Sequence, residues 1–274
     1  MVKKQLIMEK ALELFAKQGF EATSIQQITE HCGISKGAFY LSFKSKEELI
    51  LALIDRFAKL TLSGTDYLVK NTEKETLIFE FYQTMFDLFQ KHTDFAKVLL
   101  KEQMQPFNEK FMEKMYSYEK SFEQIILTMV ERVYGEEVKE SKYDLIYCIK
   151  GLLNTYTNYL LFCNAPVDLK LLAQSLVEKT NILAKYTTIP FLSREITRTF
   201  PANEKTSKEQ ILSVIEEKIE EMEELIEKES LVLLKQHLLE PTFSPAIVKG
   251  LLENIRNHPH CEWISYLLRK YYGF

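Results

Sequence analysis

The stretch that decides the fold runs from Ser24 to Leu49 and reads SIQQITEHCGISKGAFYLSFKSKEEL. Ile25 and Ile28 recur on one face of a first short helix. Gly33 follows where that helix must end, because glycine adopts left-handed backbone geometry without steric cost. Ser35 then offers a side-chain oxygen to the free N–H groups of the next helix. The stretch therefore predicts two short helices around a tight turn.

The second of these helices has a buried side and an outward side. Phe39 and Phe43 stand one turn apart and can bury together. The opposite side is small and polar, carries a single charge, and consists of Ser35, Lys36, Gly37, Tyr40, Leu41 and Ser42. Such a face suits insertion into the major groove of DNA, where Lys36 and Tyr40 would reach phosphates or base edges and Leu41 a thymine methyl group.

A further helix begins with Ser45-Lys46-Glu47-Glu48, which fits a capping box in which Glu48 reaches back to the helix start. Lys46 lies in the first turn, where a positive charge opposes the helix dipole. A phosphate contact would explain that charge, and a plain solvated lysine is the alternative.

The first helix of the motif is preceded by two candidate caps, Thr23 and Ser24, with glutamines at the matching third positions. A helix N-terminus presents free N–H groups and can bind a phosphate. Either residue is therefore a candidate DNA contact, and a role as a cap alone is nearly as well supported.

These residues resemble the N-terminal signature of the TetR/AcrR family of bacterial one-component regulators. The resemblance covers about the first fifty residues and is carried by Ala11-Leu12-Glu13-Leu14-Phe15, Gly19-Phe20, Thr23-Ser24, Ile28, Gly33-Ile34-Ser35-Lys36-Gly37-Ala38-Phe39-Tyr40 and Phe43-Lys44-Ser45-Lys46-Glu47-Glu48-Leu49. Many members carry a tyrosine or histidine where Leu41 and Ser42 stand in this chain. The family implies a homodimer that binds double-stranded operator DNA, usually as a repressor, and that a small ligand releases.

Composition points to an almost wholly helical protein. The 274 residues are 46% hydrophobic and include only 8 glycines and 7 prolines, with no set of alternating strand patterns. The net charge of −4 is not that of a broadly basic protein, although a local patch can still bind DNA. We find no nucleophile elbow, phosphate-binding glycine loop or paired Cys or His cluster, so we expect neither an enzyme nor a metal or cofactor site.

The location is expected to be cytoplasmic, because no secretory signal opens the chain and the longest uncharged run, 151–167, is too short and polar to span a bilayer.

After the motif, a helix is expected over 49–62, with a loop or kink at Ser63-Gly64-Thr65, and further helices over 76–92, 95–103, 108–134, 142–163 and 168–186. This region is rich in aromatic residues and methionine. For any one residue a place in the core is the simpler interpretation, but together they suit an apolar pocket for a small hydrophobic ligand. The candidate lining residues are Phe86, Phe89, Met104, Phe107, Phe111, Met115, Phe122, Tyr147, Asn154 and Tyr159.

Helices around 145–161 and 169–183 are the candidates for dimerisation, since family members commonly pair the corresponding helices into a four-helix bundle. The chain then continues well beyond the usual end of the family. An acidic helix is expected from Glu204 to Glu229, with apolar residues three and four apart, and we favour packing on its own domain over a free coiled coil. The run from His258 to Cys261 is interpreted as a loop rather than as a metal site.

The sequence thus predicts an all-α protein with a helix-turn-helix domain over 1–48, a helical ligand-binding and dimerisation domain over 49–190 and a C-terminal helical extension over 191–274. The leading hypothesis is a repressor released by a hydrophobic molecule, with control of an efflux pump as a first guess. The alternative is a helical interaction module that uses the acidic C-terminal helix and binds no operator.

Overall fold

The computed structural model describes residues 2–102, 109–162, 167–192, 207–222, 226–256, 258 and 261–274. Within these residues every regular element is a helix, which confirms the all-α prediction. None of these helices is long and apolar enough to cross a membrane. The chain divides into two compact units, one of residues 1–58 and 68–201 and one of residues 59–67 and 202–274.

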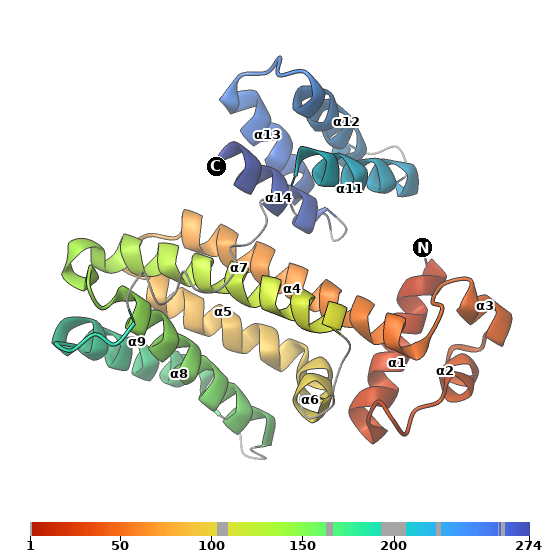
Figure 1. Cartoon of the computed structure of the whole chain (residues 1–274), viewed down its shortest axis with the longest axis horizontal. Helices are drawn as coiled ribbons and strands as arrows, with labels where there is room; N and C mark the ends of the chain where they lie inside the picture. The colour runs from red at the N-terminus through yellow and green to blue at the C-terminus, as the bar shows by residue number, and fades with distance from the viewer. Residues whose placement is uncertain are drawn as a thin grey trace. The chain divides into compact units, whose positions relative to one another are not determined.

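The first unit begins with three helices that form a compact N-terminal group (Figure 1). They are α1 (Val2–Gln18), α2 (Ile25–Cys32) and α3 (Lys36–Tyr40). Their shared core contains Ile7, Phe15, Ile28, Phe39 and Phe43, all of which are buried. The expected helix-turn-helix is therefore present at the expected residues.

The turn between α2 and α3 follows the predicted chemistry. Gly33 has a φ of 66° and a ψ of 32°, the left-handed conformation that closes a helix C-terminus. The N–H of Ile34 then bonds to the carbonyl of Thr29 at 3.0 Å. The Ser35 hydroxyl accepts from the N–H of Ala38 at 3.2 Å and so begins α3.

The long helix α4 (Lys46–Asn71) leaves this group and continues through the rest of the unit. A loop at Ser63-Gly64-Thr65, one of the two expected alternatives, is wrong, since the helix runs through these residues. Ser63 and Thr65 donate their hydroxyls back to the carbonyls of Leu60 and Thr61, at 3.2 and 2.7 Å. Leu62, Thr65 and Val69 are buried, so packing on one face holds the helix together across Gly64.

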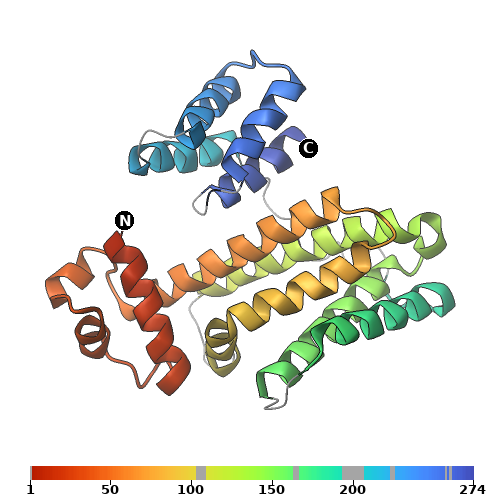
Figure 2. The same cartoon turned by 180° about the vertical axis from the view of Figure 1, so that it is seen from behind.

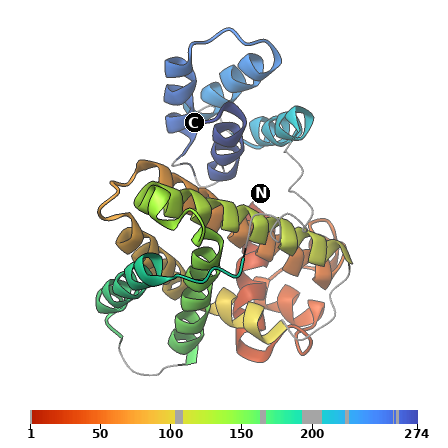
Figure 3. The ribbon, with the colours of Figure 1, turned by 60° about the vertical axis from the view of Figure 1, so that its left-hand side comes forward.

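The remaining elements of the first unit follow α4 in the chain. They are α5 (Leu77–Lys91), α6 (Thr93–Glu102), α7 (Glu109–Tyr134), the 3₁₀ turn η1 (Gly135–Val138), α8 (Lys142–Phe162) and α9 (Leu169–Tyr186). Helices α8 and α9 lie side by side, as both Figure 1 and the reverse view in Figure 2 show. After α9 an extended segment crosses α8 (Figure 3), where the Asp144 carboxylate accepts from the N–H groups of Phe191 and Leu192 at 3.0 and 2.9 Å.

Besides residues 59–67 of α4, the described part of the second unit holds four helices with a core of their own. They are α11 (Lys208–Glu221), α12 (Ile226–Leu239), α13 (Pro245–Arg256) and α14 (Glu262–Tyr272). The buried residues include Ile215, Leu234, Leu252 and Leu268. The prediction that the acidic helix packs within its own domain thus agrees with this core.

The single acidic helix expected from Glu204 to Glu229 is wrong in one respect. Helix α11 ends at Glu221, and Met222 has an extended backbone with a φ of −95° and a ψ of 143°. Its buried sulfur lies 3.7 Å from the Cys261 sulfur, so the side chain is held in the core of the unit and α12 starts as a separate helix. Pro259 and His260, part of the predicted loop, lie outside the described residues.

Candidate nucleic-acid interface

Helix α3 is anchored from one side by aromatic side chains. Phe39 and Phe43 are almost fully buried, with their ring centroids 6.1 Å apart. Phe15 and Phe20 lie in the same core, their centroids 5.3 Å apart. Only five residues form α3, too few for a helix that is stable in isolation, so this packing fixes its position.

The opposite side of α3 faces solvent, as predicted. Tyr40 is 52% exposed and Leu41 is 90% exposed. Ser35, Lys36 and Gly37 are also exposed, and Ser42 is half-buried. The Lys36 ammonium lies 3.4 Å from the side-chain oxygen of Gln26 on α2. The two helices of the motif therefore present one continuous polar surface with a single lysine at its centre.

The N-terminus of α2 separates the two candidate caps. Ser24 is the N-cap and forms a complete capping box with Gln27, whose side-chain oxygen accepts from the Ser24 N–H at 2.8 Å. Thr23 is instead buried, and its hydroxyl donates to the carbonyl of Gly19 at 2.7 Å. Of the two residues, only Ser24 is exposed where a phosphate could approach the helix end.

Lys46 has a position that neither sequence interpretation anticipated. Its ammonium donates to the backbone carbonyls of Phe20 and Thr23 at 2.7 and 3.0 Å. It also lies 4.2 Å from the centroid of the Phe20 ring, a cation–π contact. Lys46, the first residue of α4, thus holds the loop that leads into α2. It thereby fixes the position of the Ser24 cap at the start of α2.

The residues predicted to line a ligand pocket do not gather in one place. Phe86 is fully buried, Phe122 stacks on Phe81 with centroids 6.3 Å apart, and Phe89 packs on Phe57 of α4. Met115 packs against the N-terminal core, and Tyr147 borders a cleft. Asn154 and Tyr159 are exposed on α8. Met104, Phe107 and the Phe111 side chain lie outside the described residues.

The cleft that Tyr147 borders has a volume of about 790 Å³ and lies between α7, α8, residues 139–140 after η1, and residues 190–192. Its size is that of a typical small-molecule site. Its wall combines apolar and charged side chains, namely Leu127, Ile146, Tyr143, Tyr147, Pro190, Phe191 and Leu192 with Lys120, Glu123, Gln124, Glu131, Lys139, Glu140 and Lys142. Sequence reasoning singled out only Tyr147 of this set.

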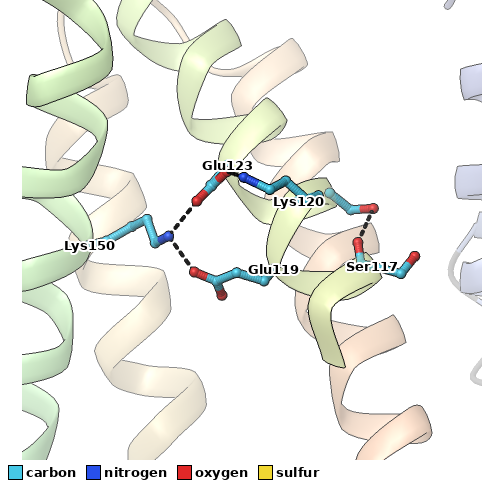
Figure 4. A network of polar contacts seen from close by, with 6 residues as sticks. Ser117, Glu119, Lys120, Glu123 and Lys150 are labelled. Carbon is cyan, nitrogen blue, oxygen red and sulfur yellow. Dashed lines mark hydrogen bonds and ion pairs between the residues drawn. The ribbon is translucent and has the colours of Figure 1, made fainter. Parts of the chain in front are cut away.

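Two lysines share the carboxylate of Glu123 (Figure 4). Glu123 and Lys120 line the cleft, and Lys150 pairs with both Glu123 and Glu119. Glu123 accepts from Lys120 at 2.7 Å through one oxygen and from Lys150 at 2.7 Å through the other. Burial raises the pKa of Glu123, but these two bonds outweigh it and leave the pKa below its usual value. Burial likewise lowers the pKa of Lys150, and its bonds to Glu119 and Glu123 more than offset this. Burial lowers the pKa of Lys120 as well, and its bond to Glu123 more than offsets this, so Lys120, Glu123 and Lys150 are charged at neutral pH.

Comparison with known proteins agrees with this geometry. Residues 7–53 match the family described as bacterial regulatory proteins, tetR family. The HTH-type transcriptional regulator YerO of Bacillus subtilis (strain 168) is 29% identical over 267 residues, 92% of this chain and 89% of that protein. The regulator YuxN of the same organism is 26% identical and covers 98% of both chains. Both alignments therefore reach well into the C-terminal unit.

A crystal structure of a transcriptional regulator of Aquifex aeolicus VF5, described as of the TerR/AcrR family, has the same fold. It covers 66% of this chain and 99% of its own, with a TM-score of 0.54 and 24% identity. The part of this chain that it leaves uncovered is about as large as the C-terminal unit and the segment before it. The matched motif shows that residues 7–53 form the helix-turn-helix domain of the tetR family, and the similar proteins of comparable length show that the chain is a transcriptional regulator of this type.

Proposed function

We propose that the protein is a homodimeric repressor that binds operator DNA through α3 and is released from it by a small molecule. The observation that carries the proposal is the outward side of α3, where Tyr40 and Lys36 are exposed directly opposite the buried Phe39. A helix anchored in this way can lie along a major groove without disturbing its own core. Ser24, Gly37, Leu41 and Ser42 complete the proposed DNA surface.

The exposed face of α8 supports a dimer. Residues 151–162 contain no charged side chain, yet Tyr159 is 58% exposed and Phe162 is 75% exposed. A Cβ atom added at Gly151 would meet no other atom within 4 Å, so nothing in the same chain covers that position. Uncharged faces with large apolar side chains are typical of subunit interfaces. We place the partner's α8 and α9 against this face.

Helix α4 offers a route from the ligand-binding bundle to the DNA surface. Its N-terminal half contributes Leu49 and Ile50 to the core of the N-terminal helices. Further along, Asp55 accepts from the Tyr118 hydroxyl and pairs with Lys114, both on α7. A shift of α7 would therefore tilt α4 and change the spacing of the two α3 helices, which must match half-sites roughly 34–36 Å apart. Control of an efflux pump stays a prediction about the target gene.

The test is selection of operator DNA by the purified full chain from a random duplex library, followed by affinity measurements on the selected sequence. Lys36→Ala is expected to weaken binding by about 1–3 kcal/mol if it reads a base edge. Tyr40→Phe should cost roughly 0.5–1.5 kcal/mol, the contribution of one hydrogen bond. Both side chains are exposed, so the melting temperature should not change.

Lys74→Ala is the matched control, because it removes one exposed lysine beyond the far end of α4. It should leave affinity for the selected DNA unchanged. Failure to select any sequence would refute the proposal and favour the interaction-module alternative. Selection of a sequence whose binding is insensitive to both α3 variants would show that another face reads the DNA.

Lys46 provides a separate prediction, since its ammonium is bound to the carbonyls of Phe20 and Thr23. We expect Lys46→Met to weaken operator binding by about tenfold through movement of the loop before α2, the effect of losing about 1.4 kcal/mol. The slope of log affinity against log salt should stay as in the wild type. A direct phosphate contact would instead lower the magnitude of that slope by about 1. Measurement at several salt concentrations distinguishes the two.

A further inference from the structure

We propose that the cleft between α7 and α8 binds an amphipathic organic anion, whose acidic head replaces Glu123 between Lys120 and Lys150. This inference rests on the proposed function only in naming the class of the releasing ligand. It departs from the purely hydrophobic ligand that the aromatic content of the sequence predicts. The chemistry of the cleft carries it in four steps.

The first step is the convergence of two ammonium groups on one acceptor. Lys120 and Lys150 come from different helices, and each bonds to a different oxygen of Glu123 at 2.7 Å (Figure 4). The side chains of Lys120, Glu123 and Lys150 are only 16, 15 and 17% exposed. The hydroxyl of Tyr147 bonds to the same carboxylate. The protein thus already holds one carboxylate in a prepared pocket for an anion.

The second step concerns which ligands can enter at such a place. Another carboxylate, or a phosphate, can take over the bonds from both lysines while Glu123 turns toward solvent, and each lysine stays paired. A cation would have to displace two ammonium groups from Glu123. A neutral ligand that displaced Glu123 would offer no charged acceptor to Lys120 in exchange, and Lys150 would keep only Glu119. Exchange of one anion for another is the substitution that keeps every half-buried charge compensated.

The third step is the place of the ligand's apolar body. Leu127 and Ile146 form part of the cleft wall, and Phe191, from the segment after α9, also lines the cleft. That segment is held in place because Asp144 accepts from the backbone N–H groups of Phe191 and Leu192. A chain or ring system attached to the acidic head can therefore lie along an apolar strip inside a volume of about 790 Å³.

The fourth step links the cleft to the DNA surface. Lys120 lies two residues after Tyr118, which together with Lys114 holds Asp55 of α4. All three residues of α7 are within two turns of one helix. A ligand that draws Lys120 away from Glu123 therefore acts on the same part of α7 that is tied to α4.

The experiment compares three probes with the same saturated tail, namely dodecanoate, dodecyltrimethylammonium and dodecanol, each below the concentration at which it forms micelles. Binding to the purified full chain is measured by calorimetry. Dodecanoate is expected to bind, and the other two are expected to bind at least about tenfold more weakly, because they lack an acceptor for two charged donors. Equal binding of all three, or a preference for the ammonium probe, would overturn the proposal.

Variants of the head-binding residues give a sharper result. Lys120→Met is expected to weaken dodecanoate binding by about tenfold, by loss of one charged hydrogen bond. Glu123→Gln is expected to tighten it severalfold, since it removes the charge that competes for the two lysines. If Glu123 instead contacted the ligand directly, Glu123→Gln would weaken dodecanoate binding. Glu75→Gln, the same change at an exposed position after α4, is the control and should have no effect.

Glu123→Gln removes the carboxylate that Lys120 and Lys150 share and leaves Lys150 paired with Glu119, so the melting temperature of each variant is measured first. If Glu123→Gln does not fold, Lys150→Met replaces it, with an expected loss of dodecanoate affinity like that of Lys120→Met. Operator selection with the same preparation separates the two proposals. DNA binding without dodecanoate binding would reject the anion cleft alone, and the absence of a selected operator would reject the proposed function alone.

Discussion

Phe39→Ala is expected to abolish operator binding at every salt concentration. The Phe39 ring is fully buried in the N-terminal core and packs against the Phe43 ring. Truncating a buried phenylalanine to alanine typically costs about 3–5 kcal/mol, through lost transfer free energy and the cavity left behind. That loss is a large part of the stability of a small domain. Helix α3 has only five residues, so its position depends strongly on this packing.

The loss should be visible without DNA. Hydrogen exchange at the backbone amides of α2 and α3 is expected to accelerate, and thermal unfolding of the N-terminal helices should begin at lower temperature. Tyr40→Ala is the matched control, because it truncates the adjacent aromatic residue on the exposed side. It should weaken operator binding and leave exchange unchanged. Normal operator binding by Phe39→Ala would mean that α3 does not read the DNA.

A charge placed on the exposed, uncharged face of α8 is expected to disrupt the dimer and to weaken operator binding strongly. Tyr159→Glu introduces a carboxylate within the uncharged run of residues 151–162. In a symmetric dimer two such carboxylates would be buried without partners, each at a cost of several kcal/mol. The protein should become monomeric by sedimentation, and operator affinity should fall by more than about a hundredfold, since half of the contacts to the DNA are lost.

Gln90→Glu serves as the control for charge alone, because it adds a carboxylate at an exposed position of α5. It should leave both the mass in solution and the affinity for DNA unchanged. A Tyr159→Glu protein that still sediments as a dimer would place the subunit interface elsewhere. A Tyr159→Phe protein that stays dimeric would show that the apolar ring, rather than the hydroxyl, makes the contact.

The N-terminal helices could be predicted in detail because their signals are local. A glycine in the left-handed conformation, a serine cap and an aromatic pair one turn apart each act within a few residues, and Gly33, Ser35 and Phe39 behave as expected. Thr23 could not be assigned in this way. Its burial depends on a bond to Gly19 that forms only once the loop folds.

Elements fixed by tertiary packing were harder to predict. Ser63-Gly64-Thr65 carries the composition of a turn, yet buried neighbours on one face keep α4 helical there. The cleft brings together Lys120, Tyr147 and Phe191, which are far apart in the sequence and belong to different elements. A list of aromatic residues cannot show which of them face the core, so Phe86 and Phe122 were expected near a ligand although both pack in the interior.

The core beneath α3 continues beyond the first three helices. Phe95 of α6 is buried in it, its ring 4.4 Å from that of Phe57 on α4, and Met115 of α7 packs against its edge. Fusion of the N-terminal helices to the ligand-binding domain of another protein would therefore fail if the chain were simply cut after residue 48. Such a chimera would need replacement side chains for Phe95 and Met115. Without them the core of the N-terminal helices would be incompletely packed, and operator binding would be weakened.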